Sequence, residues 1–295
     1  MTKQHTIPQF YLRPFLSPGW VYQKGGSVPK KKSSQRNVAV HPDYYGEDEL
    51  AEKTLDDLNS WIENCGAPVF KKLIEDPRAI NESEWIILSY LFANFAVRMP
   101  VAIEGLRAME LKWTHEVNEI ARRTGNSQFK FISRELGEES PPTTLDQIND
   151  YAARLSTEGG HLVAANDTFG LLRDIAECIS QMSFLALEAP SGLFFVSSDR
   201  PLAIESLQSG VPVGAGWGNP DAAGMIALHP SRFLLMYYQD EPSYIQILAT
   251  ADQVGLLNLK TINFAYQEIY SCFKYAEADD WMKGLEHWST TGHAS

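Results

Sequence analysis

The segment FFVSSDRPL, residues 194–202, brings hydroxyl, carboxylate and guanidinium groups together directly after an apolar run. Polar residues at the end of a buried strand are well placed to line a site. Asp199 could serve there as a catalytic carboxylate or metal ligand, with Ser198 and Arg200 contacting a substrate. The alternative is an Asx-type turn, in which the Asp199 carboxylate accepts hydrogen bonds from backbone N–H groups.

The segment FANFAVRMP, residues 92–100, places Asn94 and Arg98 four residues apart and therefore on one face of a helix. An arginine in so apolar a run needs a partner, because an unpaired buried charge costs several kcal/mol. A carboxylate is the natural partner. The pair is then either a structural ion pair or part of a site, in which Arg98 steadies a phosphate and Asn94 contacts the substrate.

Two carboxylates, Asp56 and Glu63, lie seven residues apart in an amphipathic pattern, which places them within roughly 20° of each other around a helix axis. Leu55 and Ile62 precede them at the same period, so the acids border the apolar stripe. They could bind a divalent metal such as Mg²⁺ or Mn²⁺, with Asp199 as a further ligand, or Glu63 could act as an acid or base. The alternative is a solvated helix face.

His5 lies in the segment QHTIPQFYLRPF, residues 4–15, which we expect to form a strand tied into the sheet. Alternation places His5 on the face opposite the expected buried residues, which are Thr6, Pro8, Phe10, Leu12 and Pro14. His5 is then a catalytic histidine if a polar cleft lies on that side, and otherwise a structural or exposed residue.

The order of the predicted elements indicates an α+β fold. Strands are expected at 19–24 and 37–46, and helices at 48–66, 83–99, 168–187 and 253–273. Four strand-like runs lie in the second half, among them GLFFVSSDRP and YIQILA. We expect one domain over 1–295, with a mainly helical region at about 48–190. A central mixed or antiparallel sheet would combine N-terminal strands (5–45) with the strand-rich region at about 192–275.

Charge and hydropathy exclude some classes of protein. The formal net charge of −12 repels nucleic-acid phosphate, so binding a nucleic acid or nucleotide would need a local basic patch. Lys31, in the KKK run at 30–32, is the candidate, on a loop facing the substrate. The longest apolar run is interrupted by Ser89, Asn94 and Arg98, so no membrane span is expected. The N-terminus lacks a signal-peptide pattern, which favours a cytoplasmic protein.

Several of these segments, from HTIPQFYLRPF through FFVSSDRPL to INFAYQEIY, together resemble the proteins collected as domain-of-unknown-function family 4238. These are mostly bacterial intracellular proteins with an H-x-x-P-x-x-x-L-x-x-F start and a late S-D-x-P element. The resemblance picks out six positions as motif residues: His5, Pro8, Glu63, Arg98, Asp199 and Pro201. Asp56 stands where the family has glutamate, and Asn94 stands where glutamine is frequent.

If these elements converge, His5, Glu63, Arg98 and Asp199 form a hydrolytic site. The leading hypothesis is then a hydrolase acting on phosphodiesters, such as a nuclease or a toxin-like or defence effector, with a divalent metal as cofactor. The alternative is a protein that binds or senses a small ligand, or an interaction protein, in which the polar cluster is a structural hub.

Overall fold

The computed structural model describes residues 3–16, 19–26, 29–32, 38–42, 49–130, 142–157, 167, 170–208, 216–239 and 243–283. Its largest sheet has five strands in the order β12, β7, β11, β10, β9. β12 pairs with β7 in parallel, and the other neighbours are antiparallel, so the sheet is mixed. The strands are β7 (Ser183–Glu188), β9 (Leu202–Ser206), β10 (Ala222–His229), β11 (Arg232–Tyr237) and β12 (Tyr244–Leu248). With the helices described next, this sheet confirms the α+β class.

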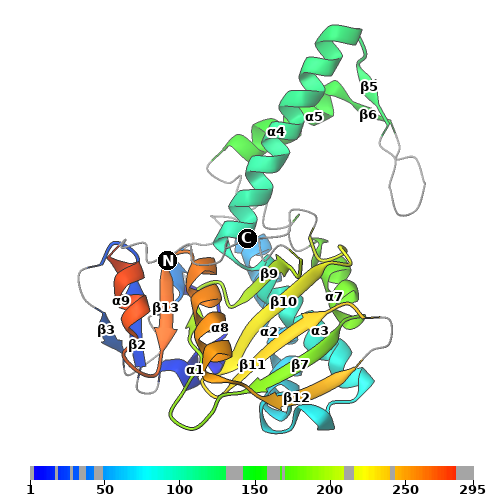
Figure 1. Cartoon of the computed structure of the whole chain (residues 1–295). Helices are drawn as coiled ribbons and strands as arrows, with labels where there is room; N and C mark the ends of the chain where they lie inside the picture. The colour runs from blue at the N-terminus through cyan, green and yellow to red at the C-terminus, as the bar shows by residue number, and fades with distance from the viewer. Residues whose placement is uncertain are drawn as a thin grey trace, which may run out of the picture.

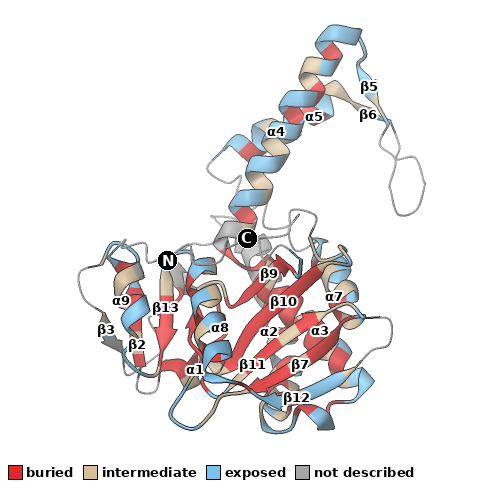
Figure 2. Ribbon diagram, in the orientation of Figure 1, coloured by how far each residue is buried: buried red, intermediate tan, exposed pale blue. Residues whose placement is uncertain are grey.

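Helices lie on both faces of this sheet (Figure 1). One face carries α2 (Glu49–Glu75), α3 (Glu82–Val97) and α7 (Leu172–Ser180). There Trp85 of α3 contacts Phe184 of β7, with ring centroids 4.7 Å apart. The opposite face carries α8 (Ala251–Phe264), from which Lys260 forms an ion pair with Glu205 of β9. Figure 2 shows that buried residues follow the central strands, so the core lies between the sheet and these helices.

A second sheet joins segments from opposite ends of the chain, in the order β3, β2, β13, β8. Its strands are β2 (Gly19–Gln23), β3 (Lys30–Lys32), β8 (Ser197–Ser198) and β13 (Glu268–Ser271). The pairing of β2 with β13 confirms that an N-terminal strand joins late strands. It does so in a four-stranded sheet of its own rather than in the largest sheet. A short helix, α9 (Ala276–Met282), follows β13.

An arm extends away from the two larger sheets (Figure 1). It consists of the long helix α4 (Pro100–Thr124), the helix α5 (Leu145–Ser156) and a small sheet of β5 (Gln128–Phe129) and β6 (Thr143–Thr144). Arg107 of α4 ties the two helices together, because its Nε–H donates to the Leu155 carbonyl of α5 at 2.8 Å. The expectation of a single domain stays a prediction.

The prediction of a strand over residues 4–15 is wrong. Only β1 (Lys3–His5) is extended there, paired with β4 (Val40–Pro42), and α1 (Gln9–Leu16) follows. Ile7, Tyr11 and Phe15 are fully buried at a spacing of four residues, which is the period of a helix rather than of a strand. The carbonyl of Pro8 accepts hydrogen bonds from the N–H groups of Tyr11 and Leu12 and so begins the helix.

The prediction that the first long helix ends at Gly66 is also wrong, because α2 continues to Glu75. Gly66 is buried where α3 packs against α2. A Cβ atom at position 66 would lie 3.0 Å from Leu91 Cδ2, which is closer than ordinary van der Waals contact. The glycine therefore permits the close approach of two helices and does not end one of them.

The predicted helix at 83–99 is confirmed, with bounds Glu82–Val97. Asn81 caps it, because its side chain accepts from the Glu84 N–H while the Glu84 side chain accepts from the Asn81 N–H. Met99 has φ −77° and ψ 137°, the extended geometry expected of a residue before a proline. The helical conformation is therefore interrupted at Met99, and α3 and α4 are separate helices.

Three other predicted elements have different bounds. The helix expected at 168–187 ends at Ser180, and its apolar second half is the central strand β7. The helix expected at 253–273 ends at Phe264, and β13 follows it. The strand expected in GLFFVSSDRP is reduced to Ser197–Ser198. Short apolar runs fit buried strands and buried helices equally well, which explains the first two errors.

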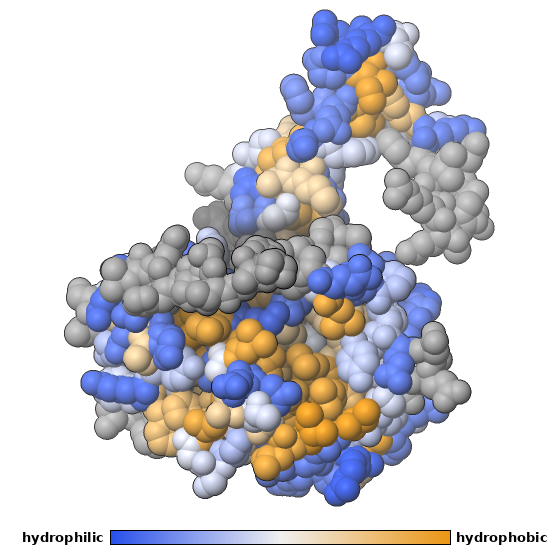
Figure 3. All heavy atoms as spheres, viewed as in Figure 1, coloured by the Kyte–Doolittle hydropathy of each residue, from blue (hydrophilic) through white to orange (hydrophobic). Residues whose placement is uncertain are grey.

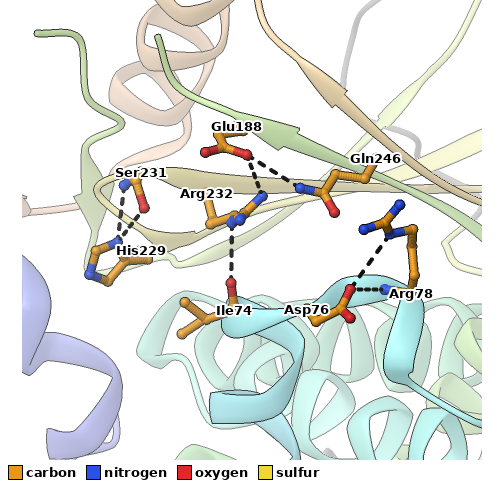
Figure 4. A network of polar contacts seen from close by, with 8 residues as sticks. All are labelled: Ile74, Asp76, Arg78, Glu188, His229, Ser231, Arg232 and Gln246. Atoms are coloured by element: carbon orange, nitrogen blue, oxygen red, sulfur yellow. Dashed lines mark hydrogen bonds and ion pairs between the residues drawn. The ribbon is translucent and has the colours of Figure 1, made fainter. Parts of the chain in front are cut away.

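Polar contacts fasten the end of α2 to the largest sheet (Figure 4). Arg232 of β11 donates from Nε to the Ile74 carbonyl at 3.1 Å and from a terminal nitrogen to Glu188 of β7 at 3.1 Å. The Gln246 amide of β12 donates to the same Glu188 carboxylate at 3.3 Å. Asp76 and Arg78, on the helix-covered side of this network, pair with each other at 3.6 Å.

Candidate functional site

Four polar residues lie where α2 and α3 face each other, and we call this group the polar seam: Asn59, Glu63, Asn94 and Arg98. Asn59 and Glu63 are one helical turn apart on α2, and Asn94 and Arg98 are one turn apart on α3. Asn59, Asn94 and Arg98 are buried, and Glu63 is half-buried. The polar seam is thus enclosed by apolar packing, in which each polar group needs a partner.

Arg98 and Glu63 form the ion pair of the polar seam, from an Arg98 terminal nitrogen to Glu63 Oε1. The Arg98 side chain is 7% exposed and the Glu63 side chain is 24% exposed. Arg98 is also the C-cap residue that follows α3, and its backbone N–H donates to the Asn94 carbonyl at 3.1 Å. The carboxylate partner expected for Arg98 is therefore Glu63, contributed by the preceding helix.

Asn94 is a polar residue of the polar seam with no solvent exposure. It lies on the α3 face between Leu91, which contacts Gly66 of α2, and Arg98, which contacts Glu63. Neither its amide nitrogen nor its amide oxygen has a hydrogen-bond partner among the residues that the structure describes. Leaving such groups unpaired costs about 1–3 kcal/mol each, and buried examples are rare in native proteins.

The Asp199 carboxylate is held by backbone amides from another part of the chain. It accepts hydrogen bonds from the N–H groups of Tyr266, Gln267 and Glu268, at 2.9, 2.6 and 3.0 Å. Burial raises the pKa of Asp199 from 3.8 to about 6, although the three N–H groups act in the opposite direction. Asp199 therefore holds residues 266–268, which lead from α8 into β13. An Asx-type turn also has the carboxylate accept from backbone N–H groups, but there those groups belong to residues next to the aspartate in sequence.

Ser198 and Arg200, which flank Asp199, have contacts of their own; we call residues 197–200 the Asp199 corner. Ser198 Oγ accepts from the Arg200 N–H at 3.2 Å and donates to the Arg200 carbonyl at 3.0 Å. The Arg200 guanidinium lies over the Phe264 ring, 5.4 Å from its centroid. Burial lowers the pKa of Arg200, and the Asp199 charge acts in the opposite direction. The predicted substrate contacts of Ser198 and Arg200 stay predictions.

The N-terminal segment reaches this corner through Tyr11, which is fully buried although it is not among the residues that the strand prediction expected to be buried. Tyr11 Oη donates to the Ala227 carbonyl at 2.7 Å and lies 2.7 Å from Ser197 Oγ. Because a phenol has a single hydrogen, Ser197 is then the donor to Tyr11. The Tyr11 ring also contacts Phe95, one turn before Arg98, with centroids 5.3 Å apart. A spacing of four residues among Ile7, Tyr11 and Phe15 was the signal that could have revealed it.

The predicted metal ligands do not come together. Within the described ranges, no group of three or more His, Cys, Asp or Glu side chains could hold a metal ion. Asp56, Glu63 and Asp199 all belong to those ranges. Glu63 is paired with Arg98, and Asp199 is bonded to the amides of residues 266–268. The metal site expected from these three carboxylates therefore gains no support from the described residues and stays a prediction.

For two other predicted site residues, His5 and Lys31, the structure describes the backbone but not the side chain. His5 belongs to β1, opposite Val40, and its side chain lies outside the described part of the chain. Lys31 belongs to β3, opposite Trp20, so the expected basic loop is a strand at this position. The side chain of Lys31 also lies outside the described part. The proposed roles of both residues stay predictions.

Comparisons with known proteins identify the family of the chain. None of the curated proteins and none of the solved structures matches it. In the part of the chain described here, no single helix is long and apolar enough to cross a membrane; only the bent pair of α3 and α4, taken together, meets that test by length and composition. The sequence model of one family matches residues 3–274, nearly the whole chain. The chain therefore belongs to the family described as "Protein of unknown function (DUF4238)".

Proposed function

We propose that this protein binds a small ligand at the polar seam and that the ligand is a nucleotide. The observation that carries the proposal is the fully buried Asn94 side chain, whose amide nitrogen and oxygen lack hydrogen-bond partners within the described ranges. A buried amide in this state is costly in the free protein. A ligand that supplies one acceptor and one donor to Asn94 would remove that cost on binding.

A nucleobase has the chemistry that Asn94 requires. The amide of asparagine presents a donor and an acceptor side by side, and the edge of adenine presents the complementary pair, N7 and the N6 amino group. Arg98 lies one helical turn away, and a guanidinium is suited to phosphate as well as to carboxylate. Because Asn94 is completely enclosed, the helices α2 and α3 must separate locally to admit the ligand.

Binding fits the described geometry better than hydrolysis does. Two of the three carboxylates expected to act as acid, base or metal ligands are already engaged, Glu63 by Arg98 and Asp199 by three backbone N–H groups. A general base needs an oxygen within hydrogen-bond reach of the substrate. Phosphodiester hydrolysis therefore stays a prediction, and the experiment below includes it as an outcome.

The experiment measures thermal stabilisation and turnover together. The full chain is heated with adenosine and guanosine mono-, di- and triphosphates and with their cyclic monophosphates, each with and without Mg²⁺. A ligand at one hundred times its Kd adds about 2.7 kcal/mol to the free energy of unfolding, so a specific ligand raises Tm. Chromatography of the same samples shows whether the nucleotide is consumed.

An Asn94→Leu variant tests whether the stabilisation arises at the polar seam. We expect at least one nucleotide to raise the Tm of the wild-type chain, to leave that of Asn94→Leu unchanged and to be recovered intact. Equal stabilisation of both proteins, or of neither, would contradict the proposal. Consumption of the nucleotide by the wild-type chain would replace it with the hydrolase hypothesis.

A further inference from the structure

In the described part of the chain, one edge of the five-stranded sheet is protected and the other is open. At the protected edge, β9 is buried apart from half-buried Ile204. At the open edge, every β12 residue except Gln246 is exposed, and Leu248 is 68% exposed. None of the five β12 residues is charged or proline, so the strand lacks the usual protection of an edge against pairing. Figure 3 shows apolar surface over the part of the sheet where β7, β11 and β12 run.

The backbone of β12 offers hydrogen-bonding groups on this open side. The Phe184 N–H donates to the Ser243 carbonyl at 3.0 Å, and the Ala249 N–H donates to the Glu188 carbonyl at 2.9 Å. Because backbone groups alternate in direction along a strand, the N–H and C=O groups of Ile245 and Ile247 also face β7. The N–H and C=O groups of Tyr244, Gln246 and Leu248 therefore point away from the sheet, and in the described ranges no strand pairs with them.

We propose that these groups pair with the same strand of a second copy of the chain, related by a two-fold axis at Gln246. Antiparallel pairing then places Gln246 opposite Gln246 of the other copy, and Tyr244 opposite Leu248. All these positions have outward-pointing backbone groups, so each pair can exchange two hydrogen bonds. The two five-stranded sheets become one continuous sheet, in a symmetric dimer whose two surfaces are identical.

The side chains fit this arrangement on both faces of the sheet. On the face that carries α8, Ile245 lies opposite Ile247 of the other copy, which forms an apolar cross-strand pair. On the face that carries α3, the exposed side chain of Leu248 lies opposite Tyr244, whose ring packs against Phe184 with centroids 4.5 Å apart. The sequence YIQIL is apolar on both sides of its central residue, so the strand is complementary to itself.

The strand β12 is itself uncharged, although the whole chain has a formal net charge of −12. Glu188, the nearest carboxylate on β7, is bonded to Arg232 and to the Gln246 amide (Figure 4). Asp76 is paired with Arg78 on the helix-covered side. These two carboxylates are therefore paired within each copy, and the five residues of β12 carry no charge that a second copy would have to approach.

Sedimentation velocity of the full chain tests the dimer. We expect a particle of twice the chain mass of 33.1 kDa for the wild type. Ile247→Lys is expected to be monomeric, because two ammonium groups would be buried against Ile245 of the opposite copy. Leu256→Lys is the matched control, since Leu256 is 54% exposed on α8 and should leave the dimer intact. A monomeric wild type, or a dimeric Ile247→Lys, overturns the proposal.

A cysteine cross-link tests the register. In a Cys65→Ser background, which removes the exposed native thiol, Gln246→Cys places two thiols in one hydrogen-bonded pair. The Cα atoms of such a pair are about 5.5 Å apart, within the range that a disulfide spans. We expect oxidation to cross-link Gln246→Cys but not Ile245→Cys, which lies opposite Ile247. A sample that sediments as a dimer without this cross-link contradicts the register.

Discussion

Replacement of Asn94 by leucine should stabilise the protein, which is the reverse of what most buried polar substitutions do. Asn94 has no solvent exposure and no partner for either amide atom in the described part of the chain. The leucine side chain has the same number of heavy atoms and the same branching at Cγ, and it has no polar atoms to satisfy. Asn258 provides a matched comparison, because it is 1% exposed but fully engaged: it accepts from the Val196 N–H and donates to the Phe194 carbonyl, each at 2.9 Å.

The expected magnitudes follow from counting unsatisfied groups. Asn94→Leu removes two groups that are unpaired in the folded state, so the free energy of unfolding should rise by about 2–6 kcal/mol. Asn258→Leu leaves the Val196 N–H and the Phe194 carbonyl without this partner, so the free energy of unfolding should fall by about 2–6 kcal/mol. In a chain of this size, 1 kcal/mol corresponds to about 2 °C in Tm. The two variants should therefore shift Tm in opposite directions.

The assay is urea denaturation, followed by far-UV circular dichroism, together with a thermal scan of each variant. The slope of unfolding free energy against urea should match that of the wild type, so that a change of midpoint reports stability alone. If Asn94→Leu lowers the midpoint as Asn258→Leu does, the Asn94 amide stabilises the free protein. The proposed ligand site would then lose the observation on which it rests.

Three further outcomes are expected. Glu63→Gln removes the carboxylate bound to the buried Arg98 guanidinium and should lower the free energy of unfolding, measured in urea, by about 3 kcal/mol. The double variant Glu63→Gln/Arg98→Met should recover part of that loss. A single variant as stable as the wild type would contradict the ion pair. Burial raises the pKa of Asp199 from 3.8 to about 6, so the folded state favours the protonated carboxyl. The free energy of unfolding should therefore fall by about 3 kcal/mol as the pH rises from 3.8 through 6. Asp199→Asn should abolish this pH dependence, and an unchanged dependence in that variant would refute the assignment to Asp199. Tyr11→Phe removes the donor to the Ala227 carbonyl and the acceptor for Ser197, and should lower the free energy of unfolding by about 1–3 kcal/mol with no change in urea slope.

Local patterns predicted where four of the helices begin better than where they end, and they predicted the α1 segment as a strand. The helix at 82–97 could be predicted because Asn81 and Glu84 form a capping box and Pro100 enforces extended geometry at Met99. These signals act over a few residues. The boundary between α7 and β7, at SFLALE, depends instead on where the apolar run is buried, since the run fits a central strand as well as a helix. Burial is a property of the whole fold.

The polar seam could be predicted partly from local sequence, whereas the contacts of the Asp199 corner depend on the whole fold. The need of Arg98 for a carboxylate could be predicted, because Arg98 is charged and its helical neighbours are apolar. Helical periods of four and seven also placed Asn94 and Glu63 on definite faces. The partners of Asp199 could not be predicted, because they are backbone N–H groups of residues 266–268, and every residue except proline carries such a group. Side-chain chemistry thus predicts which residues need partners, while the fold decides whether a carboxylate meets a cation, a metal or the backbone.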